Sequence, residues 1–585
     1  MHLSWTSVDA AIAGLLLPLG VWILLNGLDD IFVDFVAYLA ARRNASSVRP
    51  SRRLLLSEPQ KPIAIIVPLW NEAAVIARMV QQNSSSILYS NYHIFVGAYP
   101  NDEPTLNEIR KLETRYAHVH LAVCPHDGPT SKADCLNWIF QNVLAYEQAQ
   151  AVHFEIIVTH DAEDVIHSDA LHWINHYSDD YEMVQVPVLP LPKPITDWTY
   201  GVYVDEFTEY QTRDMPARQA MGAFVPSNGV GAGFRRDALD ALAEADENRV
   251  FEPVCLTEDY ENGLRLRAHG ARQLFVPLQA NGVATREYFP DTLKAAIRQK
   301  TRWITGIALQ TWERHGWIGG HVQKYWLWRD RKGLVGSPAG LLTNLVFAYG
   351  LVRWLLGAPI PDNLLMRACA VIGSYRMLYR TICVWRIFGA GFALTTPIRV
   401  FVANFINSVA TFLAFQRFFV AKLQGVPLVW VKTEHAYPCQ SALIRRKARF
   451  GEVLVTHGYI TESELQSALA TQPAHRRIGE HLVARGSIDE EAVYEALCLQ
   501  QMLPQARIDL DDVPRSIVRA LPVRVATELQ WIPFKVDLGR LFVAGPELPT
   551  AETRQKLQQF TSLAIEFHLV TPAQYRELAS QFLPA

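Results

Sequence analysis

Five short groups of polar residues in the first part of the chain carry side chains that can hold a cation, bind a phosphate or take up a proton. The groups are Pro68–Glu72, Tyr99–Asp102, His160–Asp164, Thr257–Asp259 and Gln299–Trp303. Carboxylates bind hard divalent cations and act as general bases, and an arginine can bind phosphate through two parallel hydrogen bonds. Taken singly, each acidic group is typical of a turn or a helix cap. The whole set, in this order, is much more specific.

Short apolar runs alternate with helical patterns between these groups. We expect buried strands at residues 62–69, 94–98, 119–124 and 154–159, and helices at residues 71–88, 105–117 and 131–150. This alternation predicts a mainly parallel sheet with helices on both faces. Ligands of such sheets bind beyond the carboxyl ends of the strands, and the first three polar groups follow three of these ends. We therefore expect the groups to meet at one edge of the sheet.

Residues 54–333, with these motifs, resemble a family-two glycosyltransferase of the GT-A fold, a Rossmann-like α/β fold. The resemblance is to the membrane-bound processive branch that includes cellulose, chitin and hyaluronan synthases, which carries an early Asp, a DxD, a TED and a QxxRW motif. The matching residues are Asp102 for the early Asp, Asp161 and Glu163 for DxD, and Glu258, Asp259, Gln299, Arg302 and Trp303 for the catalytic TED and QxxRW motifs.

The resemblance implies a role for each motif in an inverting sugar transfer. Asp161 and Glu163 would hold Mg²⁺ or Mn²⁺ against the leaving diphosphate. Glu163 departs from the usual Asp and reaches further, which leaves Asp164 as an alternative ligand. Asp259 would take the proton of the acceptor hydroxyl, and Arg302 would bind a phosphate. Trp303 would present an apolar face to a sugar ring or anchor the chain at a membrane interface.

A wider set of residues would contact the nucleotide sugar. It comprises Asn71, Glu72, Asp102, Lys132, Asp161, Lys432 and His435. Lys132 opens a stretch similar to one that lies beside the nucleotide in the family, although an ordinary helix start explains it equally well. Lys432 and His435 lie in residues 424–436, which resemble the segment that covers the active site of processive synthases or form a plain linker. The glycine-rich residues 229–233 lack the Lys-Ser/Thr of a P-loop, and we read them as backbone close to the acceptor.

Composition indicates a membrane protein with large soluble parts, since 50% of the residues are hydrophobic and 19% are charged. Residues 11–28 carry no charge and are long enough to span a bilayer. Arginines follow within residues 1–53, so the positive-inside rule places this end in the cytoplasm. The 55 basic residues nearly balance the 58 acidic ones, which gives no field for nucleic acid. The seven cysteines are scattered and odd in number, which fits reduced cytosol.

A second apolar region covers residues 334–423, for which we expect transmembrane and interface helices. Residues 341–356 form one plausible span, and residues 364–382 a poorer one because they contain three arginines. Residues 399–420 are amphipathic, with polar residues at helical spacing on one face, so we expect them to lie on the membrane surface. Two further crossings would then leave both soluble domains in the cytoplasm.

Residues 437–585 contain an internal repeat with an offset of 28 residues. The first copy is Arg449, Phe450, Gly451, Gly458, Leu465, Leu469 and Gln472, and the second is Arg477, Ile478, Gly479, Gly486, Val493, Leu497 and Gln500. A strand–helix alternation follows. Together these features resemble the α+β MshEN domain of secretion and pilus ATPases, which binds cyclic di-GMP. Two copies of one half-site suit this two-fold symmetric ligand, since arginine can bond the edge of guanine and glycine allows close backbone approach.

The order of catalytic domain, membrane helices and MshEN-like domain resembles the NfrB-like inner-membrane glycosyltransferases, which serve exopolysaccharide production and phage reception. The resemblance implies a hexosyl- or N-acetylhexosaminyltransferase of the bacterial inner membrane that polymerises a sugar, carried by UDP, into a surface polysaccharide and is activated by cyclic di-GMP. Its implied partners are the sugar donor, a growing glycan or lipid-linked acceptor, the bilayer, an outer-membrane export protein and further copies of the chain. Two alternatives are an enzyme that adds one sugar to a lipid carrier and a non-enzymatic receptor or scaffold.

Overall fold

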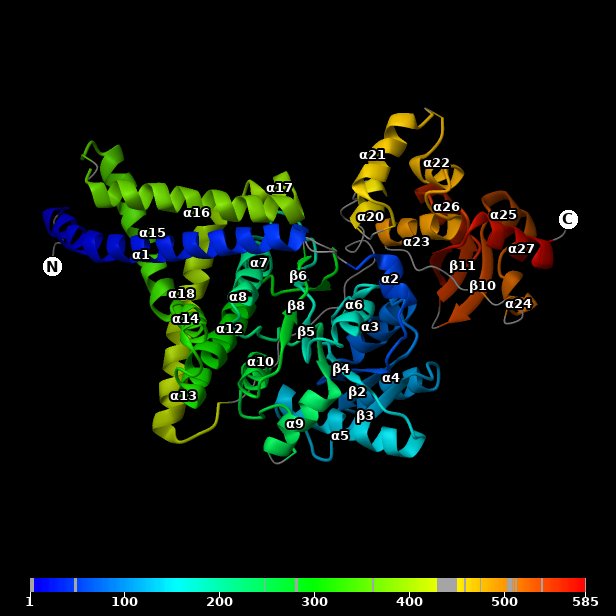
Figure 1. Cartoon of the computed structure of the whole chain (residues 1–585), viewed down its shortest axis with the longest axis horizontal. Helices are drawn as coiled ribbons and strands as arrows, with labels where there is room; N and C mark the ends of the chain where they lie inside the picture. Colours follow the sequence, from blue (N-terminus) through cyan, green and yellow to red (C-terminus); the bar gives the residue numbers. More distant parts are fainter. Residues whose placement is uncertain are drawn as a thin grey trace.

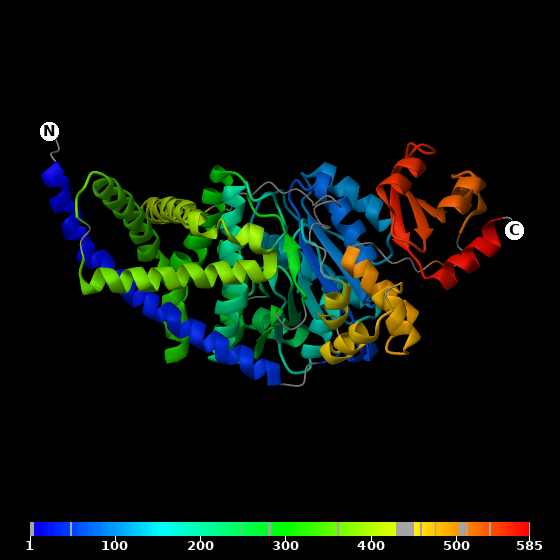
Figure 2. The same ribbon diagram turned by 90° about the horizontal axis from the view of Figure 1, so that it is seen from above.

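The computed structural model describes residues 5–583 except 47–49, 247, 279–281, 360–361, 429–449, 457–458, 474, 502–507, 509, 511–512 and 538–539. Lys432, His435, Arg449 and Gly458 therefore lie outside the described residues. In two perpendicular views, long helices form one end of the molecule, the large sheet lies in the middle and the C-terminal domain forms the other end (Figures 1 and 2).

A seven-stranded sheet with the order β3-β2-β1-β4-β7-β5-β8 is the centre of the large domain. Its strands are β1 (Ile63–Pro68), β2 (Tyr92–Ala98), β3 (Val119–Val123), β4 (Ile156–Thr159), β5 (Met183–Gln185), β7 (Ala232–Arg235) and β8 (Gln273–Phe275). Strands β1 to β4 are parallel, whereas β7 runs antiparallel to β4 and β5. The four predicted strands are confirmed as β1 to β4, and the sheet is mixed.

Helices cover both faces of this sheet because its strands are apolar on both sides. Ile63, Ile65 and Val67 of β1 belong to the core on one face, with α3 (Ala73–Ser86), α4 (Glu103–Glu113) and α6 (Ala170–Tyr177). Ala64 and Ile66 point to the other core, with α5 (Lys132–Gln150) and α9 (Arg236–Ala245). The expected helices at 71–88, 105–117 and 131–150 are thus confirmed as α3, α4 and α5.

The rest of the large domain is built from short elements between the sheet and the long helices. They are β6 (Val188–Pro190), which pairs with β9 (Thr285–Glu287), the helices α7 (Trp198–Glu209), α8 (Met215–Ala220), α10 (Glu258–Ala268), α12 (Leu293–Trp303), α13 (Thr311–His315) and α14 (His321–Arg331), and two π-helices, η1 (Tyr210–Asp214) and η2 (Ile304–Gln310). The wide turns of π-helices are frequent at functional sites, and η2 directly continues the helix that carries the QxxRW motif.

Three helices within the described residues are long and apolar enough to cross a membrane, namely residues 7–43, 333–355 and 396–424. They correspond to α1 (Trp5–Ser46), α15 (Gly333–Leu355) and α18 (Thr396–Gln424). The helix α16 (Leu364–Phe388), which contains the predicted poorer span, is not among them. Helix α18 packs along α7, α12 and α15. Its predicted place on the membrane surface stays a prediction, and its length and composition would also allow it to cross the membrane.

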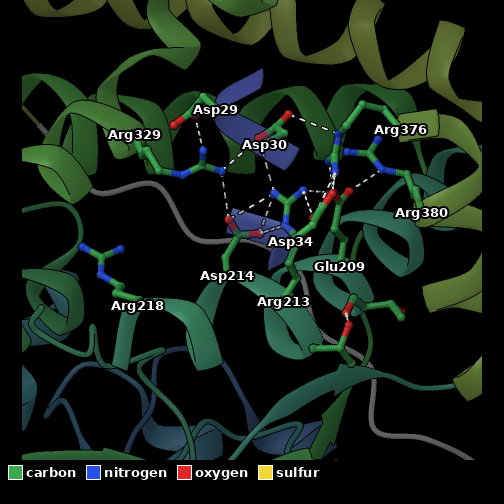
Figure 3. A network of polar contacts seen from close by, with 12 residues as sticks. Asp29, Asp30, Asp34, Glu209, Arg213, Asp214, Arg218, Arg329, Arg376 and Arg380 are labelled. Carbon is green, nitrogen blue, oxygen red and sulfur yellow. Dashed lines mark hydrogen bonds and ion pairs between the residues drawn. The ribbon is translucent and has the colours of Figure 1, made fainter. Parts of the chain in front are cut away.

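A network of charges fixes α1 to the large domain (Figure 3). Asp29 contacts the guanidinium of Arg329 on α14, and Asp30 lies 3.0 Å from the same group. Asp34 lies 3.1 Å from Arg376 of α16. Arg213 of η1 also contacts Asp30 and Asp34. The acids that end the apolar part of α1 are therefore neutralised by arginines from three other elements.

The C-terminal domain begins with the helices α20 (Phe450–Thr456), α21 (Glu462–Thr471), α22 (Ile478–Ala484) and α23 (Glu490–Gln501). A three-stranded sheet of β10 (Ile532–Asp537), β11 (Arg540–Gly545) and β12 (Ala564–Leu569) follows, with α24 (Arg515–Val518), α25 (Val523–Leu529), α26 (Ala551–Gln558) and α27 (Pro572–Phe582). The predicted strand–helix alternation of this region is confirmed. A helix of the linker after α1, α2 (Arg52–Ser57), lies between this domain and the large one.

Candidate active site

A cavity with an empty volume of about 1020 Å³ lies beyond the carboxyl ends of β1 and β4. Nine of the predicted site residues line it, namely Glu72, Lys132, Asp161, Glu163, Glu258, Asp259, Gln299, Arg302 and Trp303. They come from strand ends, helix starts and α12, separated by up to 231 positions in the chain. The fold thus brings together the motifs that the sequence spreads over most of the large domain.

Lys132 and Asp161 form an ion pair inside this cavity, with 2.6 Å between Nζ and Oδ1. Lys132 is the first residue of α5, whose N-cap Ser131 accepts a hydrogen bond from the backbone of Asp134. Burial alone would lower the pKa of Lys132, but the carboxylates of Asp161 and Glu258 raise it above its ordinary value. The lysine therefore keeps its charge and neutralises a carboxylate at the position where a cation is expected.

The donor atoms at this position fit a hard divalent cation. Asp161 and Glu163 line the same cavity, and carboxylate oxygens are the ligands that Mg²⁺ prefers, with the remaining positions filled by phosphates and water. No group of three or more His, Cys, Asp or Glu side chains suited to a metal is found in the residues that the structure describes. A cation held by Asp161 and Glu163 would take its remaining ligands from phosphates and water.

Asp164 supports the loop that carries Asp161, and it does not line the cavity. Its Oδ2 accepts a hydrogen bond from the backbone N–H of Asp161 at 3.0 Å and lies 2.7 Å from Nδ1 of His160. Both side chains are buried, and burial lowers the pKa of His160 to about 3. Oδ2 of Asp164 thus holds the loop beneath the site, and the alternative of Asp164 as a metal ligand stays a prediction.

Glu258 and Asp259 are the first two residues of α10, and both line the cavity. Burial, followed by the neighbouring charge of Asp259, raises the pKa of Glu258 to about 7. Burial also raises the pKa of Asp259, while Lys132 opposes the rise. Gly229, at φ +78°, lies so close that a Cβ there would stand 2.8 Å from Oδ2 of Asp259. The backbone of the glycine-rich segment thus forms one wall beside the predicted general base.

Asn71 and Asp102 shape the cavity without lining it. The backbone N–H of Asn71 donates to Oδ2 of Asp102 at 2.6 Å, and Asp102 is buried. Asn71 has a φ of +54°, which Asn tolerates better than most residues. The neighbouring N–H of Glu72 donates to Oγ1 of Thr105. This arrangement gives Asp102 a positioning contact, whereas its predicted contact with the nucleotide base remains a prediction.

Helix α12 presents the QxxRW residues to the cavity. Its N-cap Thr292 accepts a hydrogen bond from the backbone of Ala295. Trp303 packs against Phe289, Phe207 and Tyr203, with ring centroids 5.9–6.4 Å apart. Because the indole is held by aromatic neighbours of the large domain, one of its faces can serve as a fixed platform for a sugar ring.

Several lining residues were missed by the sequence analysis, including Trp70, Tyr99, Asn228 and Glu287. Trp70 and Tyr99 belong to the polar groups Pro68–Glu72 and Tyr99–Asp102, so their place near the site could have been predicted. Glu287 had none, because β9 is three residues long and reaches the site through backbone hydrogen bonds between Arg286 and Val165.

The two copies of the C-terminal repeat occupy equivalent positions. A Cβ on Gly451 would stand 2.8 Å from Leu465, and one on Gly479 would stand 3.0 Å from Val493 and 3.1 Å from Phe450. Each glycine thus allows its helix to pack closely on the helix that follows, and the copies touch each other. The remaining described residues of the predicted ligand site, Leu469, Gln472, Arg477, Ile478, Gly486, Leu497 and Gln500, lie on or beside α21 to α23.

Known families match both domains. Residues 59–306 match the model of the glycosyltransferase like family 2, and residues 502–585 match that of the MshEN domain. The bacteriophage adsorption protein B of Escherichia coli (strain K12) is 33% identical over 572 residues, which cover 91% of this chain and 76% of that protein. The bacteriophage N4 adsorption protein B of Escherichia coli O157:H7 gives the same values.

Two solved structures are also similar to parts of the chain. The mannosyltransferase PcManGT from Pyrobaculum calidifontis, in complex with GDP-Man and Mn²⁺, is 16% identical and covers 67% of this chain and 99% of its own, with a TM-score of 0.42. A structure of MshE with cdg is 25% identical and covers 23% of this chain and 99% of its own, with a TM-score of 0.21.

Proposed function

Since this chain belongs to the family of the bacteriophage adsorption protein B and combines a family 2 glycosyltransferase domain with an MshEN domain, we propose that it is an inner-membrane polymerase of a surface polysaccharide. It moves a hexosyl or N-acetylhexosaminyl unit from a nucleoside diphosphate, in first place UDP, to a growing glycan, and cyclic di-GMP activates it. An export protein of the outer membrane and further copies of the chain are its proposed partners.

One observation carries the catalytic part of this proposal. Asp161, Asp259 and Arg302, which lie far apart in the chain, line a single cavity together with Lys132. Six acids, Lys132 and Arg302 line the cavity, so a negatively charged diphosphate fits when a divalent cation on the acids and the two basic residues offset its charge.

The side chains divide the chemistry between them. Asp161 and Glu163 would hold the divalent cation, which supplies charge neutralisation for the leaving diphosphate. Asp259 accepts the proton of the acceptor hydroxyl while its oxygen forms a bond to the anomeric carbon. The bond from that carbon to the diphosphate oxygen breaks at the same time, so the anomeric configuration inverts. Arg302 receives the charge of the departing diphosphate, and Trp303 orients the acceptor sugar.

A buried contact supports direct communication between the C-terminal domain and the catalytic domain. Arg52 donates to Asp169 through Nε at 2.8 Å and to Glu495 of α23 through Nη1, also at 2.8 Å. Its guanidinium lies 4.6 Å from the ring centroid of Tyr459. Glu495 stands between the repeat residues Val493 and Leu497. If cyclic di-GMP binds one arrangement of the two repeats better than another, its binding can therefore shift α23, the helix that contacts the catalytic domain through Arg52.

The test is a panel of radiolabelled nucleotide sugars incubated with membranes that contain the full chain, with and without cyclic di-GMP, followed by measurement of product length. We expect one donor to give a long polymer only when Mg²⁺ or Mn²⁺ is present, and the yield to rise with cyclic di-GMP. A single added sugar would favour the lipid-carrier enzyme. Absence of metal-dependent transfer and hydrolysis with every donor would favour the receptor or scaffold.

A further inference from the structure

A second, smaller cavity lies behind the predicted active site, between α12 with η2 and the helix α18. Its empty volume is about 370 Å³, and it shares Leu256 and Arg302 with the large cavity. Arg298 and Arg302 line it from α12, and Arg417 lines it from α18. None of the residues that the sequence motifs assign to catalysis, other than Arg302, takes part in this wall.

The charge of this cavity is unbalanced. Three arginines line it, and none of the described residues that line it is acidic. In the part of the chain that the structure describes, none of the three forms an ion pair within 4 Å, whereas nearby cations are paired, Lys300 with Glu206 and Lys422 with Glu313. The Nε of Arg302 is buried and has no hydrogen-bond partner there. Positive charges that share a cavity repel one another, and a bound anion would offset this repulsion.

The helix geometry keeps these positive charges together. Arg298 and Arg302 are four residues apart, so they project from the same face of α12. Thr301 and Thr305 also line the cavity, but their hydroxyl protons are donated to the backbone oxygens of Ile297 and Thr301, both at 2.7 Å. Anion binding would therefore depend on the arginines. Their planar, always charged groups match the oxygens of a phosphate.

The surroundings point to a phosphate at the membrane side of the site. Within the described residues, helix α18 is one of three helices that are long and apolar enough to cross a membrane. Leu428 also lines the cavity, and Val420, Leu423 and Val426, which precede it in the chain, expose their apolar side chains. A basic cavity bordered by exposed apolar residues is suited to a lipid whose phosphate head enters the cavity while its chain stays outside.

We propose that Arg298, Arg302 and Arg417 bind a phosphate group on the acceptor side of the predicted active site, either as the head of a lipid or as free phosphate or pyrophosphate. This inference rests on the proposed glycosyltransferase function for its biological use, but phosphate binding does not require turnover. Because Arg302 belongs to both cavities, a phosphate here would stand next to the donor and place a lipid-borne acceptor beside it.

The experiment measures binding to the full chain in phosphatidylcholine nanodiscs. One arm adds radiolabelled polyprenyl monophosphate to the discs, and the other titrates radiolabelled inorganic pyrophosphate. The variants are Arg298→Ala and Arg417→Ala, which leave the large cavity untouched. Lys294→Ala is the matched control, because Lys294 is an exposed cation of the same helix and does not line the cavity. Arg417→Lys tests whether charge alone restores binding.

We expect each arginine-to-alanine variant to weaken binding at least tenfold and Lys294→Ala to bind as the unmodified chain does. Tighter binding of the lipid identifies a lipid head as the ligand, and equal or tighter binding of pyrophosphate identifies a soluble one. Binding of neither probe above protein-free discs, or equal binding by all variants with unchanged thermal unfolding, would overturn the proposal. Loss of transfer with intact phosphate binding would count against the proposed function alone.

Discussion

The contact of Arg52 with Glu495 allows a quantitative test of how the C-terminal domain transmits the binding of cyclic di-GMP to the catalytic domain. The change is Glu495→Gln, which removes the charge but keeps the shape of the side chain. Arg52 then still has Asp169, which is buried, so the catalytic domain keeps its own ion pair. Glu491→Gln is the matched control, since Glu491 is an exposed acid of the same helix.

The expected size follows from the contact. A hydrogen bond between charged groups contributes about 1.5–3 kcal/mol. At about 1.4 kcal/mol for each factor of ten, its loss shifts the equilibrium between coupled and uncoupled domains by roughly 10- to 100-fold. The side chain of Glu495 is 19% exposed, so the lower end of this range applies. We therefore expect the ratio of stimulated to basal transfer to fall about tenfold, or to one if the stimulation is smaller.

The assay compares sugar incorporation by membranes over a range of cyclic di-GMP concentrations. Because coupling between two binding equilibria is reciprocal, the apparent affinity for cyclic di-GMP should change together with the stimulation. The Glu491→Gln chain should keep both values. Unchanged stimulation and unchanged affinity in Glu495→Gln would refute the idea that this contact transmits the signal.

Further predictions concern the large cavity. Asp259→Asn should reduce transfer at least 100-fold while donor binding, followed by equilibrium dialysis, stays within a few-fold, because only proton transfer is lost; normal turnover would remove the base assignment. Lys132→Met should lower donor affinity, measured in the same way, but also lower the metal concentration needed for half-maximal transfer, since Asp161 loses the positive charge that competes with the cation; unaltered metal dependence would contradict this. Gly229→Ala should unfold at lower temperature and transfer more slowly, because a side chain would meet Asp259 and a positive φ disfavours alanine. Glu258→Gln should stabilise the metal-free chain at pH 8 but not at pH 4. The pKa of Glu258 rises from 4.5 in the unfolded chain to about 7 on folding, so its deprotonation costs stability as pH rises through this window, by about 3 kcal/mol at most. Equal differences in melting temperature between the variant and the unmodified chain at both pH values would disprove this.

The strands that position the site could be predicted because their signal is local. Residues 62–69 form a continuous apolar run, and such a run buried on both faces gives β1, with Ile63 and Ala64 facing opposite cores. The motifs then follow the carboxyl ends of β1, β2 and β4, where a parallel sheet collects its ligands. The periodicity of the C-terminal repeat was equally local, and Gly451 and Gly479 occupy equivalent positions.

Other features could not be predicted because they depend on contacts between distant residues. Arg52 belongs to a run of arginines that placed the end of the first helix in the cytoplasm, and nothing in that run showed that it is buried between Asp169 and Glu495, 117 and 443 positions away. Glu287 reaches the large cavity only because β9 bonds to the segment after β4. Nothing local indicated that Arg417 lines the same cavity as Arg298, since this follows only from the packing of α18 on α12.

The free energies of these contacts also indicate which contact between parts of the molecule responds to cyclic di-GMP. Asp29, Asp30 and Asp34 of α1 contact arginines of α14, η1 and α16, and each hydrogen bond between charged groups contributes about 1.5–3 kcal/mol. A ligand at one hundred times its dissociation constant supplies only about 2.7 kcal/mol. That is too little to separate α1 from the large domain, where several such pairs would break together. It is enough to change the contact of Arg52 with Glu495, so we expect the C-terminal domain to move on a catalytic domain that stays fixed to its first helix.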